Sequence, residues 1–453
     1  MPLLASLGVG FGGFKYISLG TNTKHFATMF YTQTVSDPST YSTDNITSNV
    51  LYLQTPRVEL DNSGNYYFNW SQAYQITLRD YWRGGTFKFL PDGTFSGILD
   101  NYQTDGTALG FGVFNLYDGK LYYSSSTYPG HFKSFTLNGV ESTEQYRTTN
   151  QAGSQIKGAK FAPSGNYYTV SQLSTASDIL ITKANTAGNG IAQHSKTNLY
   201  GPALMDIDSS ENLYFGGGTG GGGQIWSFDS SLDPRWSFTW TASGDGSSTD
   251  RTGLTFIHYA SSNNSILFGT RGGDAAGSEI DGIGTVRADT GQRIWSKSLY
   301  NTGIPLCGTS DPDGNFYLGI ARTGNPNTVL TANTNVLKVN TTGSIVWSRD
   351  ISCTVKQIKY IDGDLVFAGI RPRNNEFRQL ILMRVPADGS KTGNYFSGRL
   401  HYKDSSNVEL TDSYTSSNTT LTAGTKTGTF SLTRTTAANL ITTGTVTSDY
   451  IKV

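Results

Sequence analysis

A polar turn followed by a short apolar strand recurs seven times along this chain. In each copy Asp, Asn, Ser or Gly residues form the turn, and large aromatic or aliphatic residues follow. The copies span residues 61–68, 117–123, 163–168, 208–215, 262–268, 311–317 and 362–367. Their first strand residues are 66, 121, 167, 213, 266, 316 and 365, which lie 46 to 55 positions apart. A period near 50 that is filled with strand signals is typical of a β-propeller.

A second element alternates with the first one. It is a strand that carries a basic or polar residue and is usually followed by a turn glycine. Its copies span residues 86–89, 132–135, 180–183, 225–228, 285–288, 336–339 and 382–385. Two independent markers in register make chance periodicity improbable. The sequence therefore predicts an all-β fold, a single β-propeller in which seven blades are favoured over eight.

The two flanks of the repeat region have their own composition. Residues 51–397 are predicted to form the propeller. Residues 1–50 form an N-terminal arm with a strand at Phe26 to Tyr31, and residues 398–453 a Ser/Thr-rich β extension. Strands from the terminal flanks are expected to close the ring, because closure removes an open sheet edge. The alternative is an eighth blade built by both flanks, since Tyr414 falls 49 residues beyond Leu365.

Several repeats carry an aromatic residue on the strand after the second turn. These residues are Trp236, Trp295, Trp347 and Phe396. A large flat side chain buries most area between two neighbouring blades, so that position is predicted for them. Stacking against carbohydrate is the alternative role for a single tryptophan.

The charge balance and the N-terminus exclude some classes of protein. The chain of 453 residues has 34 basic and 34 acidic residues, and its formal net charge is +0. A nucleic-acid binder would need a basic stripe. The first 13 residues lack the basic segment of a secretory signal, and no apolar run approaches the roughly 20 residues that span a bilayer. We expect a protein that is made in the cytoplasm and is not inserted into a membrane.

Three segments resemble ligand-binding loops but are better explained by local structure. The segments 311–315 and 206–212 are rich in Asp and Asn, yet they lack the longer pattern of an EF-hand calcium loop. Their recurrence favours hairpin turns. The run Gly216–Gly223 lacks the Lys-Ser/Thr ending of a phosphate loop, and a strand follows it. It is interpreted as a mobile loop between strands.

No constellation of residues predicts catalysis, cofactor binding or a metal site. The histidines have no zinc spacing, and no Gly-x-Ser-x-Gly elbow occurs. Cys307 and Cys353 each precede a repeat strand. A pair of buried free thiols is favoured over a disulfide between adjacent blades. The five histidines are His25, His131, His194, His258 and His401.

The repeats resemble those of quinoprotein-type and related bacterial β-propellers. The segments 289–295, 340–347 and 313–317 carry this resemblance, which covers roughly residues 55 to 397. It implies the fold rather than an activity. Quinoprotein dehydrogenases hold their cofactor under a vicinal cysteine pair, whereas Cys307 and Cys353 are far apart in sequence. A quinone cofactor is therefore not expected.

The first 13 residues resemble the start of virion proteins from tailed, particularly marine, phages. This resemblance implies a non-enzymatic structural protein of the tail or capsid surface, present in multiple copies beside other virion proteins. A host-surface glycan or protein is a further partner that it implies. The alternative is an extracellular glycan-binding or glycan-processing bacterial propeller. In either case the binding surface is expected where the repeats differ, at residues 216–223, 242–251 and 272–281 and in the flanks.

Overall fold

The protein is an all-β single propeller, in which every regular element of the described residues is a strand. No helix that could cross a membrane occurs among these residues. The computed structural model describes residues 24–31, 33–34, 52–76, 79–105, 111–125, 131–137, 141–147, 155–172, 178–185, 189–196, 200–219, 222–242, 253–271, 280–300, 303–322, 333–373, 377–395, 400–405, 410, 414–419, 425–427, 430–431, 434–436, 446–447 and 450–452.

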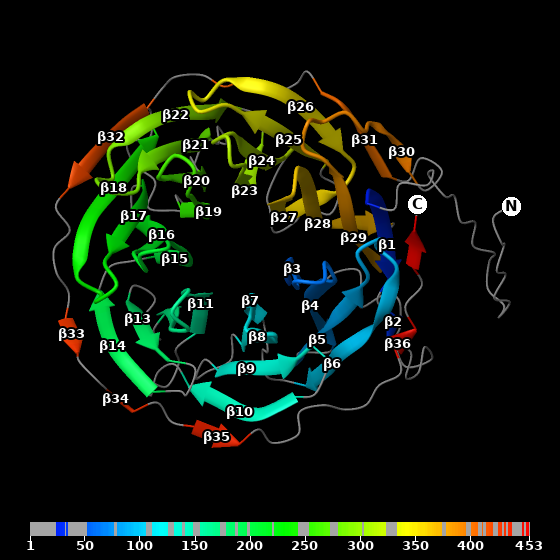
Figure 1. Cartoon of the computed structure of the whole chain (residues 1–453), viewed down its shortest axis with the longest axis horizontal. Helices are drawn as coiled ribbons and strands as arrows, with labels where there is room; N and C mark the ends of the chain where they lie inside the picture. Colours follow the sequence, from blue (N-terminus) through cyan, green and yellow to red (C-terminus); the bar gives the residue numbers. More distant parts are fainter. Residues whose placement is uncertain are drawn as a thin grey trace, which may run out of the picture.

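Six blades are each made of four consecutive antiparallel strands, arranged around a common axis (Figure 1). The first blade consists of β3 (Tyr52–Leu60), β4 (Tyr66–Ile76), β5 (Arg79–Phe89) and β6 (Phe95–Asp105). The second consists of β7 (Phe111–Tyr117), β8 (Lys120–Ser125), β9 (His131–Thr136) and β10 (Glu141–Arg147). The third consists of β11 (Gln155–Phe161), β12 (Tyr167–Gln172), β13 (Ile179–Ala184) and β14 (Asn189–Lys196). The fourth blade consists of β15 (Tyr200–Ile207), β16 (Leu213–Thr219), β17 (Gly222–Phe228) and β18 (Pro234–Ala242). The fifth consists of β19 (Gly253–Ala260), β20 (Ser265–Arg271), β21 (Ile280–Arg287) and β22 (Arg293–Tyr300). The sixth consists of β23 (Ile304–Ser310), β24 (Phe316–Ala321), β25 (Thr334–Val339) and β26 (Ile345–Ile351).

A further sheet joins the two ends of the repeat region. It consists of β27 (Thr354–Ile361), β28 (Asp364–Arg373) and β29 (Phe377–Pro386), followed by β1 (Phe26–Tyr31) from the N-terminal flank. β1 pairs antiparallel with β29, from Phe26 opposite Arg384 to Tyr31 opposite Gln379. The strand predicted at Phe26 to Tyr31 therefore exists with these bounds, and it covers the outer edge of β29. The predicted count of seven blades depends on this mixed sheet.

The C-terminal flank runs around the outside of the ring, and we call its strands the outer belt. Each belt strand adds to an edge that an earlier strand left open, in an order opposite to that of the blades (Figure 1). β31 (Leu400–Asp404), beside β30 (Gly393–Tyr395), pairs with β26; β32 (Tyr414–Thr419) with β18; β33 (Thr425–Thr427) and β34 (Phe430–Ser431) with β14; β35 (Arg434–Thr436) with β10; β36 (Val446–Thr447) with β2 (Gln33–Thr34); and β37 (Tyr450–Lys452) with β1. Tyr414 thus lies opposite Ala242 at the edge of an existing blade, not in an eighth blade.

The repeated turn joins the first and second strands of each sheet. The hairpin from Glu59 to Tyr67, for example, bends at Gly64, whose φ of 79° favours glycine. The second repeated element is the third strand of each sheet, and its turn glycines include Gly93, Gly291, Gly343 and Gly389, all with positive φ. Both sequence markers are therefore confirmed as local hairpin structure.

Aromatic residues on the outer strands lock neighbouring blades together. Trp236 of β18 covers Gly291 of the next blade so closely that a Cβ there would collide with its ring, and its Nε1 donates a hydrogen bond to the Ala288 carbonyl at 3.0 Å. Trp295 covers Gly343 in the same way. Trp347 likewise covers Gly389 of the sheet that follows its own. The predicted packing of these tryptophans between blades is confirmed, and Phe396 lies outside the described residues.

Phe26 of β1 takes the position of these tryptophans at the joint between the last and first sheets. Its ring covers Gly93 after β5, and Thr28 Oγ1 donates a hydrogen bond to the Gly93 carbonyl at 2.9 Å. Phe26 is 3% exposed and packs with Phe68, Phe89 and other core residues of both sheets. The N-terminal strand therefore supplies both the pairing and the aromatic contact that close the ring.

We predict that Phe26→Ala lowers the free energy of unfolding by about 3–5 kcal/mol, since it leaves a cavity at the ring joint. Val346→Ala is the matched control, because Val346 is 55% exposed and its truncation is expected to change stability by no more than about 0.5 kcal/mol. Urea denaturation followed by tryptophan fluorescence measures both. Equal effects of the two variants would contradict the closing role of Phe26.

Candidate functional site

Three repeat turns share a network of one aspartate, one asparagine and one tyrosine. In the turn at Asp208, Oδ1 accepts hydrogen bonds from the backbone N–H groups of Ser210 and Asn212, at 2.9 and 2.8 Å. Oδ2 accepts from Asn212 Nδ2 and Tyr214 Oη, both at 2.8 Å. Asp61 and Asp311 likewise accept hydrogen bonds from the backbone N–H and the Nδ2 of an asparagine and from a tyrosine hydroxyl.

These hydrogen bonds use the carboxylate oxygens that a cation would need. Burial opposes the ionisation of Asp61, but the donors from Asn65, Tyr67 and Ser63 outweigh it and lower its pKa. Burial and the Asp208 carboxylate raise the pKa of Tyr214, so that its hydroxyl stays a donor. No group of three or more potential metal ligands occurs among the described residues. The hairpin interpretation of these turns is supported, and the hydrogen bonds of their side chains stabilise the fold.

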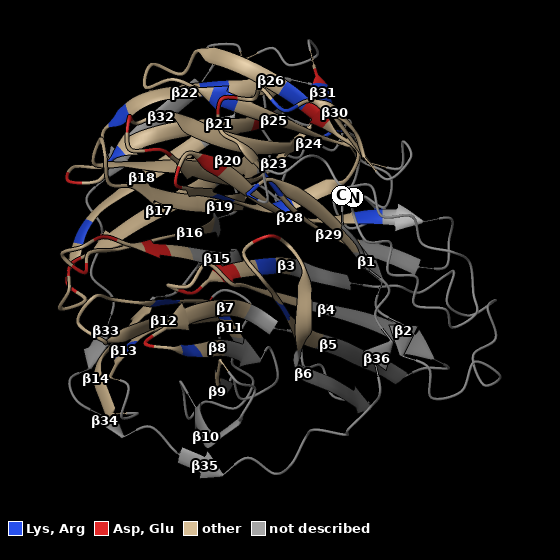
Figure 2. Cartoon of the chain, turned by 45° about the vertical axis from the view of Figure 1, so that its right-hand side comes forward, with Lys and Arg blue, Asp and Glu red and all other residues tan. Residues whose placement is uncertain are grey.

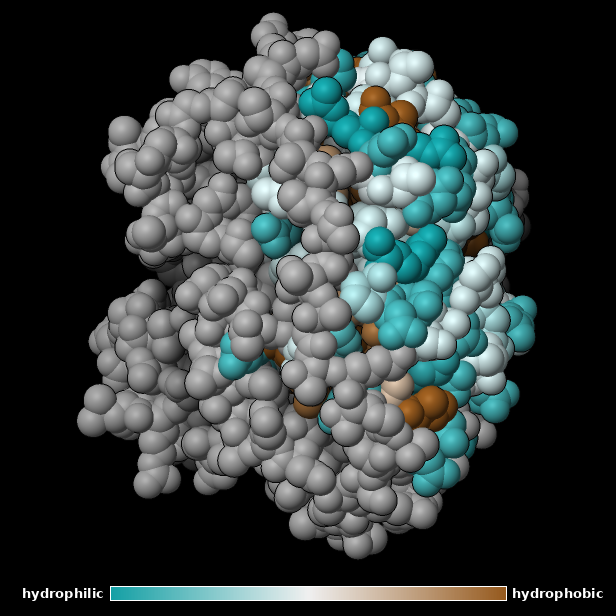
Figure 3. All heavy atoms as spheres, turned by 90° about the vertical axis from the view of Figure 1, so that its left-hand side faces the viewer, coloured by the Kyte–Doolittle hydropathy of each residue, from teal (hydrophilic) through white to brown (hydrophobic). Residues whose placement is uncertain are grey.

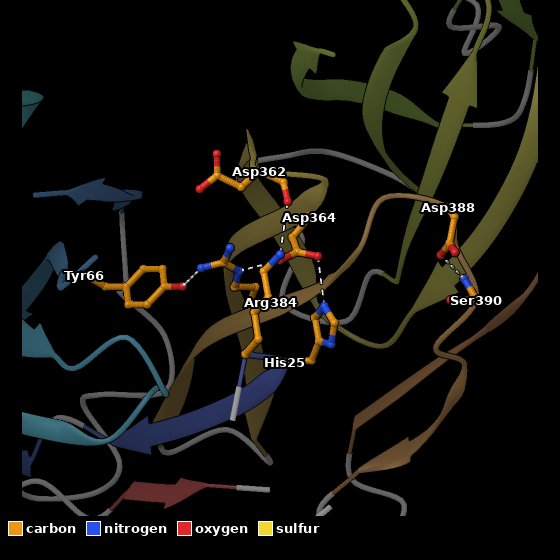
Figure 4. Close-up of polar contacts among 8 residues, drawn as sticks. His25, Tyr66, Asp362, Asp364, Arg384, Asp388 and Ser390 are labelled. Carbon is orange, nitrogen blue, oxygen red and sulfur yellow. Dashed lines mark hydrogen bonds and ion pairs between the residues drawn. The ribbon is translucent and has the colours of Figure 1, made fainter. Parts of the chain in front are cut away.

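A second polar network holds the N-terminal strand at the ring joint (Figure 4). The Asp364 carboxylate at the start of β28 is 4% exposed and lies 2.9 Å from His25 Nε2 and 2.9 Å from Lys24 Nζ. Arg384 Nε of β29 donates to the same carboxylate at 2.8 Å. Another Arg384 nitrogen donates to Tyr66 Oη of the first blade at 2.8 Å. One buried aspartate of β28 therefore connects the N-terminal flank with β29 and, through Arg384, with the first blade.

The pKa of Asp364 is lowered by this network. Burial opposes ionisation, but the hydrogen bonds from His25, Lys24 and Arg384 outweigh it. Asp364 titrates near pH 3.9 in the unfolded chain and at lower pH in the folded chain, so the unfolded state binds a proton first. The stabilisation from Asp364 is thus complete above that unfolded pKa and is lost as the pH falls through the folded pKa.

We predict that Asp364→Asn lowers stability at neutral pH by about 3–5 kcal/mol, because it leaves buried Arg384 without its charged partner. The deficit relative to the wild-type protein should begin to shrink as the pH falls below about 4, where Asp364 of the unfolded chain takes up a proton, and should continue to shrink until Asp364 is neutral in the folded chain as well. Thermal unfolding of both proteins across this pH range measures the difference. A deficit that stays constant with pH would contradict the assignment.

The inner strands β3, β7, β11, β15, β19, β23 and β27 face the axis of the propeller (Figure 1). One position in each pairs with the second apolar residue of the repeat, as Glu59 pairs with Tyr67 and Asp206 with Tyr214. We call the residues at this position the inner ring. They are Glu59, Asn115, Lys160, Asp206, His258, Thr309 and Lys359.

Neighbouring blades contact one another through the inner ring. Lys160 Nζ lies 3.3 Å from Asp206 Oδ1, and His258 Nδ1 lies 3.5 Å from Asp206 Oδ2. His258 Nε2 also lies 3.0 Å from Ser310 Oγ. Lys359 Nζ lies 2.5 Å from Glu59 Oε2, across the joint that β1 closes. The inner ring therefore contains polar contacts between blades, and its charged side chains keep partial access to solvent.

The charges of the inner ring stabilise one another. Burial opposes the ionisation of Asp206, but the Lys160 ammonium and His258 hold the pKa of that carboxyl far below its usual range. The Asp206 carboxylate in turn raises the pKa of Lys160. From the sequence alone, Asp206 is only part of a segment that resembles a calcium loop. The repeats contain a signal for the ring, because aligned copies place a polar residue at this position in every blade.

The prediction of a mobile loop at Gly216–Gly223 is wrong for most of that run. Gly216, Gly217 and Gly218 belong to β16 and pair with residues of β17, which begins at Gly222. A Cβ at Gly216 would collide with Leu254 of the next inner strand. The glycines therefore permit close packing between blades, which is a second use of glycine besides turns and loops. Residues 220–221 lie outside the described residues.

The two cysteines are buried free thiols, as predicted. Both belong to one core cluster, and Cys307 Sγ lies 3.7 Å from the Val355 carbonyl oxygen. Burial raises the pKa of Cys307 to about 12 and also raises that of Cys353. Thiols of this kind are poor nucleophiles and poor metal ligands at neutral pH.

The structure places the remaining histidines, His131, His194 and His401, on separate strands. His194 packs edge-on against Phe228, and His401 belongs to the outer belt. His131 begins β9. The predicted surfaces at residues 242–251 and 272–281 lie almost wholly outside the described residues, as do residues 1–23.

Comparison with known proteins gives no family. No protein-family model and no curated protein match the chain. Solved structures with some likeness include BamB from Moraxella catarrhalis, at 10% identity and a TM-score of 0.38 over 73% of this chain and 100% of that one. The β-propeller domain of Nup133 from Vanderwaltozyma polyspora has 8% identity and a TM-score of 0.41 over 78% and 98%. The polysaccharide lyase Uly1 has 7% identity and a TM-score of 0.43 over 81% and 98%. Likeness of this degree carries no argument about function, so the propeller assignment rests on the order of the strands.

Proposed function

We propose that this chain is a non-enzymatic structural protein, a rigid propeller platform that makes contacts within a larger assembly. The outer belt is the observation that carries this proposal. Its strands occupy outer edges of five of the large sheets, where an open row of backbone N–H and C=O groups would otherwise invite uncontrolled pairing. A ring whose edges are covered can present its loops and flanks to partners while the scaffold stays fixed.

The start of the belt is fastened by charged contacts. His401 Nε2 of β31 lies 2.7 Å from Asp350 Oδ2, whose side chain is 4% exposed. Arg349 donates to Asp404 at 2.8 Å, and Tyr402 is wholly buried. These contacts support a belt that is a fixed part of the fold.

The surface of the described residues also suits a structural role. In the view of Figure 2, segments with basic residues and segments with acidic residues are interspersed over the described strands. The described part of the face in Figure 3 is mostly hydrophilic or intermediate, with small separate hydrophobic spots. Large hydrophobic side chains that are exposed include only Leu90, Ile294 and Val346 among the described residues. Three aspartates of the repeat turns, Asp61, Asp208 and Asp311, are engaged in local hydrogen bonds.

We further infer that the mixed sheet of β27, β28, β29 and β1 acts as a seventh blade. Its fourth strand comes from the N-terminal flank, yet Phe26 contacts Gly93 just as Trp236 contacts Gly291 in the next blade. The inner ring also continues through this sheet, from Lys359 to Glu59. Both kinds of contact between blades are thus present at the joint.

The assembly that we propose is the virion of a tailed phage, with the chain on the tail or capsid surface. This part of the proposal rests on the resemblance of residues 1–13 to virion proteins. Its partners would be other virion proteins and, through the variable loops, a host-surface glycan or protein. The chain would be made in the host cytoplasm and carried in the particle.

Purified particles test this proposal directly. Mass spectrometry of the virions should find the chain in multiple copies, and imaging of the particle should place propeller-shaped density on the tail or capsid surface. Absence of the chain from purified virions would contradict the proposal. Release of reducing sugar from a host polysaccharide by the isolated protein would instead support the alternative, a glycan-processing propeller.

A further inference from the structure

A carboxylate, an imidazole and a hydroxyl from three successive blades meet near the axis. Asp206 belongs to β15, His258 to β19 and Ser310 to the end of β23. His258 Nδ1 lies 3.5 Å from Asp206 Oδ2, and His258 Nε2 lies 3.0 Å from Ser310 Oγ. The same order of groups activates the nucleophile in serine hydrolases, on folds that are otherwise unrelated.

The contact with Asp206 decides which nitrogen of His258 carries the proton. An ionised carboxylate only accepts hydrogen bonds, so we assign the proton of the neutral ring to Nδ1, which faces Asp206. Nε2 is then the acceptor, and it faces the Ser310 hydroxyl. His258 can therefore take the proton of Ser310 as a general base. The 3.5 Å contact is long for a hydrogen bond, as is common before a substrate binds.

Asp206 is held in place by other groups besides His258. The backbone N–H of Tyr259 donates a hydrogen bond to its Oδ2 at 2.8 Å, and Lys160 Nζ lies 3.3 Å from its Oδ1. Burial opposes the ionisation of Asp206, but Lys160 and His258 keep the pKa of its carboxyl far below the usual range. A fixed, ionised carboxylate stabilises the positive charge that an imidazole gains with a proton. Asp206 thus has the role of a positioning residue.

The three side chains keep access to solvent. The side chain of His258 is 25% exposed and that of Asp206 is 14% exposed. Ser310 is half-buried and directly precedes the repeat turn at Asp311. A fully buried group of this kind could not meet a substrate, whereas these side chains can be reached by a small molecule.

We propose that Ser310 is an activated nucleophile that accepts an acyl group from a carboxylic ester. Ser310 Oγ attacks the carbonyl carbon of the ester, and the bond from that carbon to the leaving oxygen breaks as the new one forms. The hydroxyl proton passes to His258 Nε2 and from there to the leaving alkoxide. The products are acylated Ser310 and an alcohol. A single transfer to one side chain goes beyond the proposed structural role and is compatible with it.

Reaction of the full-length protein with p-nitrophenyl acetate tests this nucleophile. Peptide mapping by mass spectrometry follows the rate at which each serine is acetylated. Ser262 is the internal control, because it is exposed and its hydroxyl donates to the Asp311 carbonyl at 3.1 Å rather than to a histidine. We expect Ser310 to react about a hundredfold to ten-thousandfold faster than Ser262, which is the range of general base catalysis. Equal rates would overturn the proposal and leave Ser310 as a polar contact between blades.

The same comparison in urea shows whether the folded arrangement causes the reactivity. Because the three residues come from different blades, unfolding separates them. The rate at Ser310 should then fall to that at Ser262. A ratio of the two rates that is unchanged in urea would contradict the proposal, and this test needs no variant.

Variants assign the roles of the two partners. His258→Asn should lower the ratio of the Ser310 rate to the Ser262 rate by about a hundredfold or more, because it removes the base. Asp206→Asn should also lower this ratio, and Asp206→Glu should restore part of it, since it keeps a carboxylate. An unchanged ratio in His258→Asn would overturn the proposal. An unchanged ratio in Asp206→Asn would overturn the positioning role of Asp206.

Discussion

The pairing of β1 with β29 is the contact on which the rest of the ring depends. Without it the outer edge of β29 is open, and Phe26 cannot cover Gly93 of the first blade. The same strand carries the belt strand β37 on its other side. The buried Asp364 adds a charged anchor for Lys24 and His25, just before this strand. The closure of the circle of sheets thus depends on a six-residue strand that lies outside the repeats in the sequence.

Two kinds of side-chain contact, at different distances from the axis, hold neighbouring blades together. Near the outside, an aromatic ring covers a turn glycine of the next blade, as Trp236 covers Gly291. Near the axis, polar side chains such as Lys160 and Asp206 contact one another across blades. The apolar core between the sheets lies between these two zones. The aromatic contact is described at four consecutive joints, where Trp236, Trp295, Trp347 and Phe26 each cover a turn glycine of the next sheet.

The sequence is sufficient to predict the features that depend on neighbouring residues. The hairpins follow from turn residues such as Gly64, and the tryptophan packing follows from the regular spacing of large aromatic residues. The outer belt was predicted only as a β extension, because its short Ser/Thr-rich strands do not specify which remote edge they join. The use of Gly216 depends on Leu254 of another blade, so composition alone suggested a loop. The inner ring was missed because its charges meet only when the blades are assembled.

Hydrogen–deuterium exchange of the backbone amides tests the closing strand most directly. If β1 is an integral part of the ring, the amides of residues 26–31 exchange as slowly as those of β29 and become exposed together with them as denaturant is added. The account predicts this common protection. Fast exchange of residues 26–31 while β29 and the blades remain protected would contradict it.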